Sequence, residues 1–181
     1  ENSIEHGDIQ VVFTVAEEGG LLGSKNLDYS KIYARYGLVL DGGGPIGSVA
    51  IKAPSQYKIF VTVKGKAAHA GISPEKGISA IEIASAAISR MKLGRIDFET
   101  TANIGSIHGG GETNIVCDRV DIKAETRSRD MNKLERQKEH MRECFEKAAE
   151  EFGGNVDFIA EIEYPSYNIS DDAKIMRILR K

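Results

Sequence analysis

Several features are absent from this chain of 181 residues, and each absence excludes a class of protein. No apolar run approaches the roughly 20 residues that cross a bilayer, and the first ten residues lack both the basic and the apolar segment of a secretory signal. The formal charge is −3 with both signs interspersed, which argues against nucleic acid or anionic lipid as a partner. We therefore expect a cytoplasmic protein without membrane or nucleic-acid partners.

Cysteine is scarce as well. Cys117 and Cys144 lie far apart and match no CxxC spacing of a zinc or redox site, so we expect buried thiols in a reducing compartment. The chain also lacks an initiator methionine. Its last segment, "SDDAKIMRILRK", begins a helix that we expect Ser170 to cap, and no C-terminal stop signal follows. Both ends look cut from a longer chain.

The apolar content of 41% is ample for a packed core, and its pattern changes near Pro54. Before Pro54, two apolar runs at residues 11–15 and 38–40 are separated by a glycine turn and a short helical stretch at 21–27. Continuous apolar strands that alternate with helix are typical of a parallel sheet covered on both faces. We therefore expect residues 1–53 to be part of an α/β domain.

After Pro54 the apolar residues alternate with polar ones, which indicates strands buried on one face. One helix is expected from Ser73 to Met91, and a second from about 131 to 151 with Leu134, Met141, Phe145, Ala148 and Phe152 on its apolar stripe. Strands are expected at residues 57–64, 101–107, 119–125 and 156–164. This β-α-β-β-α-β order predicts an α+β fold: a ferredoxin-like domain at 54–165, flanked by the partial α/β domain to which 166–181 returns.

Two adjacent carboxylates follow the first apolar run, in the segment "VVFTVAEEGG". Glu17 and Glu18 end this run, and Asp41, followed by three glycines, ends the next. Ends of neighbouring strands meet in one crevice of an open α/β sheet, where three hard oxygen donors suit a divalent metal. Acids placed near a helix N-terminus are an alternative. A phosphate site at the glycines is less favoured, because no GxxxxGK[ST] or GxGxxG spacing is present.

Three further residues are candidates for ligand binding, although each has an ordinary structural alternative. His69 lies among small residues in the segment "KGKAAHAG", which lets a ligand approach closely, but a loop histidine is also commonly solvated. Asn114 ends the segment "GGGETN", which resembles a flexible hairpin loop. Arg127 belongs by parity to the polar face of its strand.

Five segments resemble one family in this order: "FTVAEEGG", "LVLDGGG", "VTVKGKAAHAGISPEKGISAI", "GGGETNIVCDRV" and "AETRSRD". They are similar to the middle of the cytosolic dizinc metallopeptidases that include peptidase T, carboxypeptidase G and the aminoacylases, with peptidase T-like proteins nearest. The resemblance covers essentially the whole chain. It implies a tripeptidase-like or aminopeptidase-like exopeptidase for small peptides, with a ferredoxin-like dimerisation lid inserted into a zinc-binding α/β domain.

The resemblance also implies roles for the three acids. Glu17 would be the general base, Glu18 a ligand of one zinc ion, and Asp41 a ligand of the other. One carboxylate would hold a metal while its neighbour takes a proton from water, which explains their adjacency. The family's remaining ligands are a histidine in an HxD motif, a bridging aspartate and a late histidine, and no stretch here matches them. We therefore expect the two Zn²⁺ ions and the activity only in a longer parent protein.

The resemblance implies that His69 contacts the substrate in the active site of a partner subunit, while Asn114 and Arg127 bind the substrate backbone and carboxylate. The homodimer would form through the first lid helix and the uncharged edge strand near 101–107. Two alternatives stay open. One is an N-acyl-amino-acid or dipeptide hydrolase of the same family, and the other is a stand-alone ferredoxin-like regulatory module that binds an amino acid. RNA binding is disfavoured, because the strand at 119–127 has no aromatic residues.

Overall fold

The computed structural model describes residues 5–180, and its contacts divide the chain into two compact units. One unit, here called the sheet unit, is Ile51–Ile169. The other, the terminal unit, takes in residues up to Ala50 and those from Ser170 onward. None of the helices within residues 5–180 is both long and apolar enough to cross a membrane.

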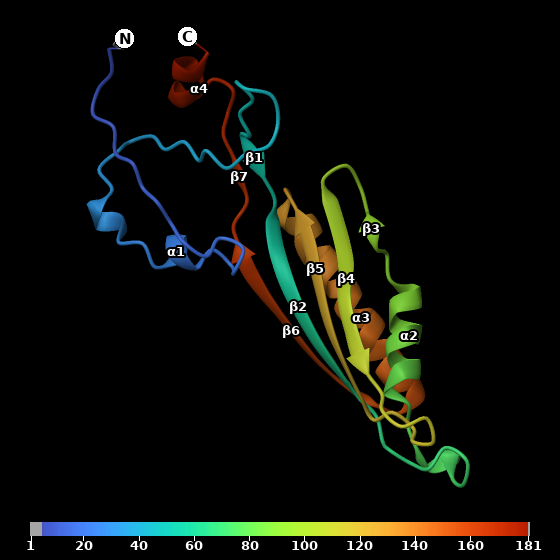
Figure 1. The fold of residues 1–181 in the computed structure, drawn as a ribbon. Helices are drawn as coiled ribbons and strands as arrows, with labels where there is room; N and C mark the ends of the chain where they lie inside the picture. Colours follow the sequence, from blue (N-terminus) through green and yellow to red (C-terminus); the bar gives the residue numbers. More distant parts are fainter. Residues whose placement is uncertain (1–4, 181) are drawn as a thin grey trace. The chain divides into compact units, whose positions relative to one another are not determined.

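The sheet unit is built on a five-stranded antiparallel sheet with two helices on one face (Figure 1). The strands lie in the order β3-β4-β5-β2-β6, and the main elements follow one another along the chain as β-α-β-β-α-β. This is the predicted α+β order. The bounds are β2 Ser55–Lys64, α2 Ala80–Arg90, β3 Gly94–Arg95, β4 Thr100–Gly109, β5 Arg119–Ser128, α3 Met131–Phe152 and β6 Asn155–Tyr164.

The remaining elements are short. A two-stranded antiparallel sheet pairs β1 with β7, and single turns of 3-10 helix precede residue 32 and residue 77. The bounds are α1 Leu22–Lys25, η1 Tyr29–Lys31, β1 Lys52–Ala53, η2 Pro74–Lys76, β7 Tyr167–Asn168 and α4 Lys174–Leu179.

The core of the sheet unit lies between the sheet and its two helices. Alternate residues of β2, namely Ile59, Val61 and Val63, are at most 2% exposed, because a strand turns every second side chain to the same face. Their antiparallel register pairs Val61 with Ile122 of β5. The helices contribute further buried side chains, among them Ile83, Leu134, Met141 and Phe145.

Helix α3 has a defined signal at each end. The Asp130 side chain accepts hydrogen bonds from the N–H groups of Asn132 and Lys133, and Gly153 ends the helix in the left-handed region with φ of 78°. Of the five residues predicted to form its apolar stripe, four are fully buried. Phe152 is 38% exposed, so its prediction was wrong, since the last helical residue lies beside the turn at Gly153.

Helix α2 begins later than predicted. Pro74–Lys76 forms only a 3-10 turn, and the side chain that caps α2 is that of Ser79, which accepts from the N–H of Glu82 at 3.2 Å. The intervening chain is extended because Ile78 and Lys66 exchange two backbone hydrogen bonds, each 2.8 Å long. A tertiary contact therefore overrides the local helix signal at Ser73.

The terminal unit departs further from its prediction. Residues 10–15 and 38–40 carry no strand, and Phe13 and Leu40 are more than 90% exposed. A strand needs a partner strand to take its backbone hydrogen bonds, and within residues 5–180 no strand pairs with these segments. The short helix α1 does fall within the predicted stretch 21–27. Ser170 does not cap α4, which begins after Ala173 without a side-chain cap.

The two cysteines are free thiols. Cys144 is buried on α3, whereas Cys117 is half-buried before β5, so the expectation of burial holds fully for Cys144 alone.

Candidate functional site

Two loops at one end of the sheet are hydrogen-bonded to each other, and they carry His69 and Asn114 (Figure 1). The first loop leaves β2, and the second joins β4 to β5. The N–H of Ala70 donates to the carbonyl of Asn114 at 2.8 Å, and the N–H of Val116 donates to the carbonyl of Ala68 at 2.9 Å. His69 thereby faces Ile115 across an antiparallel bridge. The fold brings the two predicted residues together, with both side chains exposed.

The hydrogen bonding of His69 defines how its ring can act. The backbone N–H of Gly71 donates to His69 Nδ1 at 3.2 Å. Because Nδ1 accepts this bond, the proton of the neutral imidazole belongs on Nε2. His69 therefore presents an N–H donor at the exposed side of the loop, which suits an interaction with a carbonyl oxygen.

Arg127 lies near the other end of β5 and is held by Glu125 on the same face of the strand. Arg127 Nε and Nη2 donate to the two carboxylate oxygens of Glu125 at 2.9 and 3.0 Å. These bonds raise the pKa of Arg127 above its ordinary value. Gln56 of β2 also donates to Glu125, at 2.7 Å. The predicted carboxylate-binding residue is thus held by Glu125, which is itself held by Gln56, and the sequence analysis singled out neither of these two residues.

Arg127 lies far along β5 from the two loops that carry His69 and Asn114. Asp118, whose carbonyl accepts from the N–H of Gly65, lies at the loop end of β5. Nine residues of extended chain lead from Asp118 to Arg127, which corresponds to roughly 30 Å. One sheet unit therefore presents two separate groups of candidate residues, His69 with Asn114 at one end and Arg127 at the other.

In the terminal unit, Glu17 and Glu18 occupy a tight turn that leads into α1. The carbonyl of Glu17 accepts from the N–H groups of Gly20 and Leu21 at 3.0 and 2.9 Å. Ala16 and Leu21, which flank this turn, have φ of 54° and 61°. Such left-handed conformations are rare for residues with a side chain and cluster at functional sites. Both carboxylates are exposed.

Glu18 and Asp41 are the two predicted metal ligands. Carboxylates such as those of Glu18 and Asp41 are suitable donors for a divalent cation. Within residues 5–180, however, no group of three or more His, Cys, Asp or Glu side chains is close enough to hold a metal ion. The described residues therefore do not form a metal centre by themselves.

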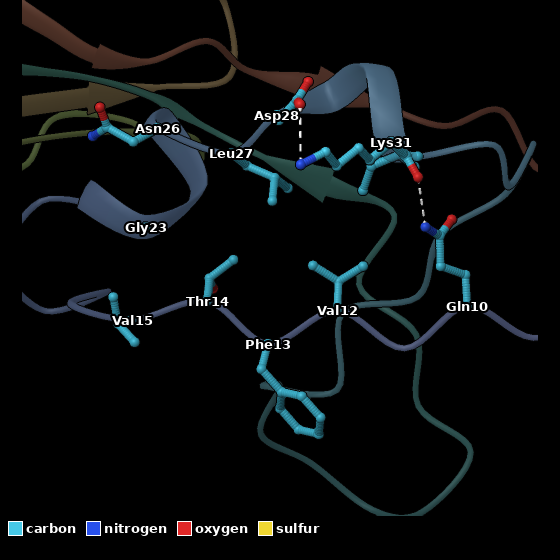
Figure 2. Close-up of a pocket in the computed structure, with 11 residues that line it drawn as sticks. Gln10, Val12, Phe13, Thr14, Val15, Gly23, Asn26, Leu27, Asp28 and Lys31 are labelled. Atoms are coloured by element: carbon cyan, nitrogen blue, oxygen red, sulfur yellow. Dashed lines mark hydrogen bonds and ion pairs between the residues drawn. The ribbon is translucent and has the colours of Figure 1, made fainter.

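A cavity of about 390 Å³ lies inside the terminal unit, between the extended segment 10–15 and residues 23–32 (Figure 2). In Figure 2, Val12 and Thr14 point toward the part of the chain that carries Leu27 and Lys31, whereas Phe13 points away from it. Gln10 closes one end, where its side-chain amide donates to the carbonyl of Lys31 at 2.7 Å. The described lining includes Asp28 but not Glu17, Glu18 or Asp41, so the cavity is not the site of these three acids.

A second hollow, of about 370 Å³, lies on the sheet face opposite the helices. Its lining includes Lys58 and Phe60 of β2, Asn103 of β4, and Lys123 and Glu125 of β5. Glu125 therefore takes part both in this hollow and in the pairing with Arg127. The signal for Glu125 in the sequence is its position two residues before Arg127, which places both side chains on one face of the strand.

Residues 56–153 match a known family, the peptidase dimerisation domain of the M20 peptidases. The chain belongs to this family. The matched residues run from β2 to the end of α3, and they include both loops that carry His69 and Asn114.

Two solved structures resemble this M20 chain along most of its length. The aminopeptidase PepT of Bacillus cereus is 49% identical, with a TM-score of 0.83 over 91% of this chain and 44% of its own. A tripeptidase of Staphylococcus aureus, SAV1512, is 44% identical, with a TM-score of 0.88 over 92% of this chain and 44% of its own.

A curated relative, the uncharacterized protein YqjE of Bacillus subtilis, is 51% identical over the whole of this chain and 49% of its own length. The M20 chain therefore spans about half the length of the relatives it matches. Together with the family match, these relatives place it in the peptidase T-like group, as its motifs predicted.

Proposed function

We propose that the full-length protein is a metal-dependent exopeptidase of the tripeptidase or aminopeptidase type, which hydrolyses small peptides as a homodimer. The observation that carries this proposal is the pairing of His69 with Asn114 at one end of the sheet unit. The relatives named aminopeptidase and tripeptidase, at 49% and 44% identity, support the same substrate class.

His69 and Asn114 would act on the substrate directly. His69 Nε2 carries the N–H that would donate to the scissile carbonyl oxygen and stabilise the negative charge that develops there. The Asn114 amide, on the loop bonded to that of His69, would bind the peptide backbone of the substrate. Both groups are exposed and would reach a substrate held by another subunit.

Arg127 would bind the substrate carboxylate without losing Glu125. An arginine side chain has five N–H donors, and the bonds to Glu125 use Nε and one N–H of Nη2. The remaining N–H groups of Nη1 and Nη2 form a second fork that matches a carboxylate. Glu125 would therefore orient the guanidinium instead of competing with the substrate.

The separation of these groups supports a site shared between subunits. An extended tripeptide spans at most about 11 Å, which is far less than the roughly 30 Å between Arg127 and the loop end of β5. One sheet unit cannot bring all three residues to one small substrate. We propose that one subunit supplies Arg127 and its partner supplies His69 and Asn114.

The acids of the terminal unit would complete the chemistry in the full-length protein. Glu17 would take a proton from the attacking water, while Glu18 and Asp41 would each contribute one carboxylate to a different zinc ion. Because residues 5–180 form no metal centre, we expect this chain alone neither to bind two Zn²⁺ ions tightly nor to hydrolyse peptides. The proposed domain limits are 1–53, 54–165 and 166–181.

The test is a substrate panel with the full-length protein. Tripeptides should be cleaved, and His69→Ala and Asn114→Ala should each lower kcat/KM by about 10²-fold, the effect of removing one oxyanion donor. Glu75→Gln, at an exposed acid in the turn after the His69 loop, is the matched control and should retain the wild-type rate. Cleavage of N-acyl amino acids or dipeptides in preference to tripeptides would contradict the proposed substrate class. Amino-acid binding without hydrolysis would favour a regulatory module.

A further inference from the structure

Gly77 occupies a tight place, where a side chain fits only if its neighbours shift by a few tenths of an ångström. A Cβ at this position would lie 3.0 Å from the Cβ of Ala68 and 3.0 Å from both Cβ and Cγ1 of Val116. The backbone of Gly77 has φ of −91° and ψ of 162°, an extended conformation that any residue adopts. Conformational freedom therefore does not require glycine here. The close approach of two other segments does.

The two segments that enclose Gly77 are the ones that carry the candidate site. Ala68 directly precedes His69, and Val116 follows Asn114 by two residues. Their backbones are joined by the hydrogen bond from the N–H of Val116 to the carbonyl of Ala68, 2.9 Å long. Gly77 is bordered by these two side chains, so a larger residue at 77 would press on both loops.

Gly77 cannot move away from these loops easily, because the next residue is fixed. Ile78 and Lys66 exchange backbone hydrogen bonds at 2.8 Å in each direction, and the N–H of Ala80 donates to the carbonyl of Cys117 at 2.8 Å. The segment with Gly77 is therefore bonded to both loops. A side chain at 77 has to be accommodated by displacing Ala68 or Val116, and with them His69 or Asn114.

We propose that Gly77 is a positioning residue for peptide hydrolysis. Because Gly77 has no side chain, its segment can pack tightly against the His69 loop and the Asn114 loop, and this packing sets the relative placement of His69 and Asn114. The proposal rests on the proposed function, in which both residues contact the substrate. Gly77 itself contacts no reacting atom. Its effect is expected on turnover more than on folding, because the three contacts lie at the periphery of the sheet and not in its core.

The experiment is a size series at residue 77 in the full-length protein. Gly77→Ala and Gly77→Val should lower kcat progressively, on the order of tenfold and about 100-fold, as expected when reacting groups are displaced by up to 1 Å. KM should change less than kcat, and the melting temperature of Gly77→Ala should stay close to wild type. Amide hydrogen exchange at Ala70 and Val116 should become faster, since these groups report the contact between the loops directly.

Gly111→Ala is the matched control, because it lies in the Asn114 loop and a Cβ there meets nothing within 4 Å. It should leave kcat and the exchange rates unchanged. Wild-type kcat in both Gly77 variants, with His69→Ala inactive, would overturn the positioning role and leave the proposed function standing. Wild-type rates in His69→Ala and Asn114→Ala would overturn both. If Gly77→Val does not fold, kcat and hydrogen exchange of Gly77→Ala decide the question.

Discussion

At the scale of single residues, the turn at Glu17 and Glu18 combines two neighbouring charges with unusual backbone. Ala16 and Leu21 are both left-handed, which costs of order 1–3 kcal/mol each and persists only where the surroundings require it. A turn held in this way fixes the backbone positions from which the side chains of Glu17 and Glu18 extend. Two adjacent acids can then serve two purposes, one as a base and one as a ligand.

Glu17→Gln in the full-length protein should retain its metal but lose most of its turnover. The change removes proton transfer, which typically contributes ~10²–10⁴-fold, and leaves the proposed ligands in place. Glu18→Gln should instead lower the metal content. Steady-state kinetics together with metal analysis of the purified variants separates the two outcomes. A wild-type rate in Glu17→Gln with unchanged metal content would show that another group acts as the base.

The types of the candidate residues were predictable from the sequence, but their partners were not. His69 and Asn114 were singled out within separate segments, and only the fold shows that their loops are bonded together. The pairing of Arg127 with Glu125 depends on rotamers and on Gln56 from another strand. The need for glycine at residue 77 was not predicted, because it arises from contacts that are distant in sequence.

At the scale of secondary structure, a short turn joins β3 to β4 and ties the edge of the sheet to α3. The Asp97 side chain accepts from the N–H groups of Glu99 and Thr100, each at 2.9 Å, and pairs with Lys133 at 3.2 Å. The hydrogen bond from Glu99, aided by Lys133, lowers the pKa of Asp97 to about 2. This turn leads directly into β4, the strand that we expect at the dimer interface.

The stabilising effect of Asp97 should depend on pH in a defined direction. Its carboxyl has a lower pKa in the folded state than the roughly 3.9 of an unfolded aspartate, so the stabilisation is complete above about pH 4. It is lost as the pH falls through about 2. Asp97→Asn should therefore be less stable than wild type at pH 7, and the difference should narrow by pH 2.5.

Urea unfolding of this chain at the two pH values measures the difference. Glu75→Gln controls for the loss of one exposed carboxylate and should show a smaller change at pH 7. An Asp97→Asn chain as stable as wild type at pH 7 would contradict the role assigned to this turn.

The elements of the sheet unit were predictable because their signals are local. Alternating burial marks β2, β5 and β6, and Asp130 with Gly153 marks the ends of α3. In the terminal unit the helical stretch at 21–27 was predicted, but the two expected strands are absent, since residues 10–15 and 38–40 have strand-like composition but no strand beside them within residues 5–180. Amino-acid composition indicates that a segment favours the strand conformation, but the segment forms part of a sheet only if a second strand lies beside it and takes its hydrogen bonds.

At the scale of the whole molecule, the free edge of β4 and the exposed side of α2 are available for the proposed homodimer. Strand β3 covers β4 at Thr101 and Ala102, so the edge of β4 beyond them has no paired strand among the described residues. Ile107 of β4 and Ile81 of α2 are 49% and 44% exposed. An uncharged edge strand beside exposed apolar side chains favours pairing with a second copy.

The central claim is that each active site combines Glu17 of one subunit with His69 of its partner, and mixed dimers test it most directly. Full-length Glu17→Gln and His69→Ala proteins, each nearly inactive, are mixed in equal amounts and allowed to exchange subunits. In a mixed dimer one shared site carries both substitutions and the other carries neither, so the mixture should recover about a quarter of the wild-type specific activity. If each site is instead formed within one subunit, every site keeps one substitution, and the mixture stays as inactive as its components.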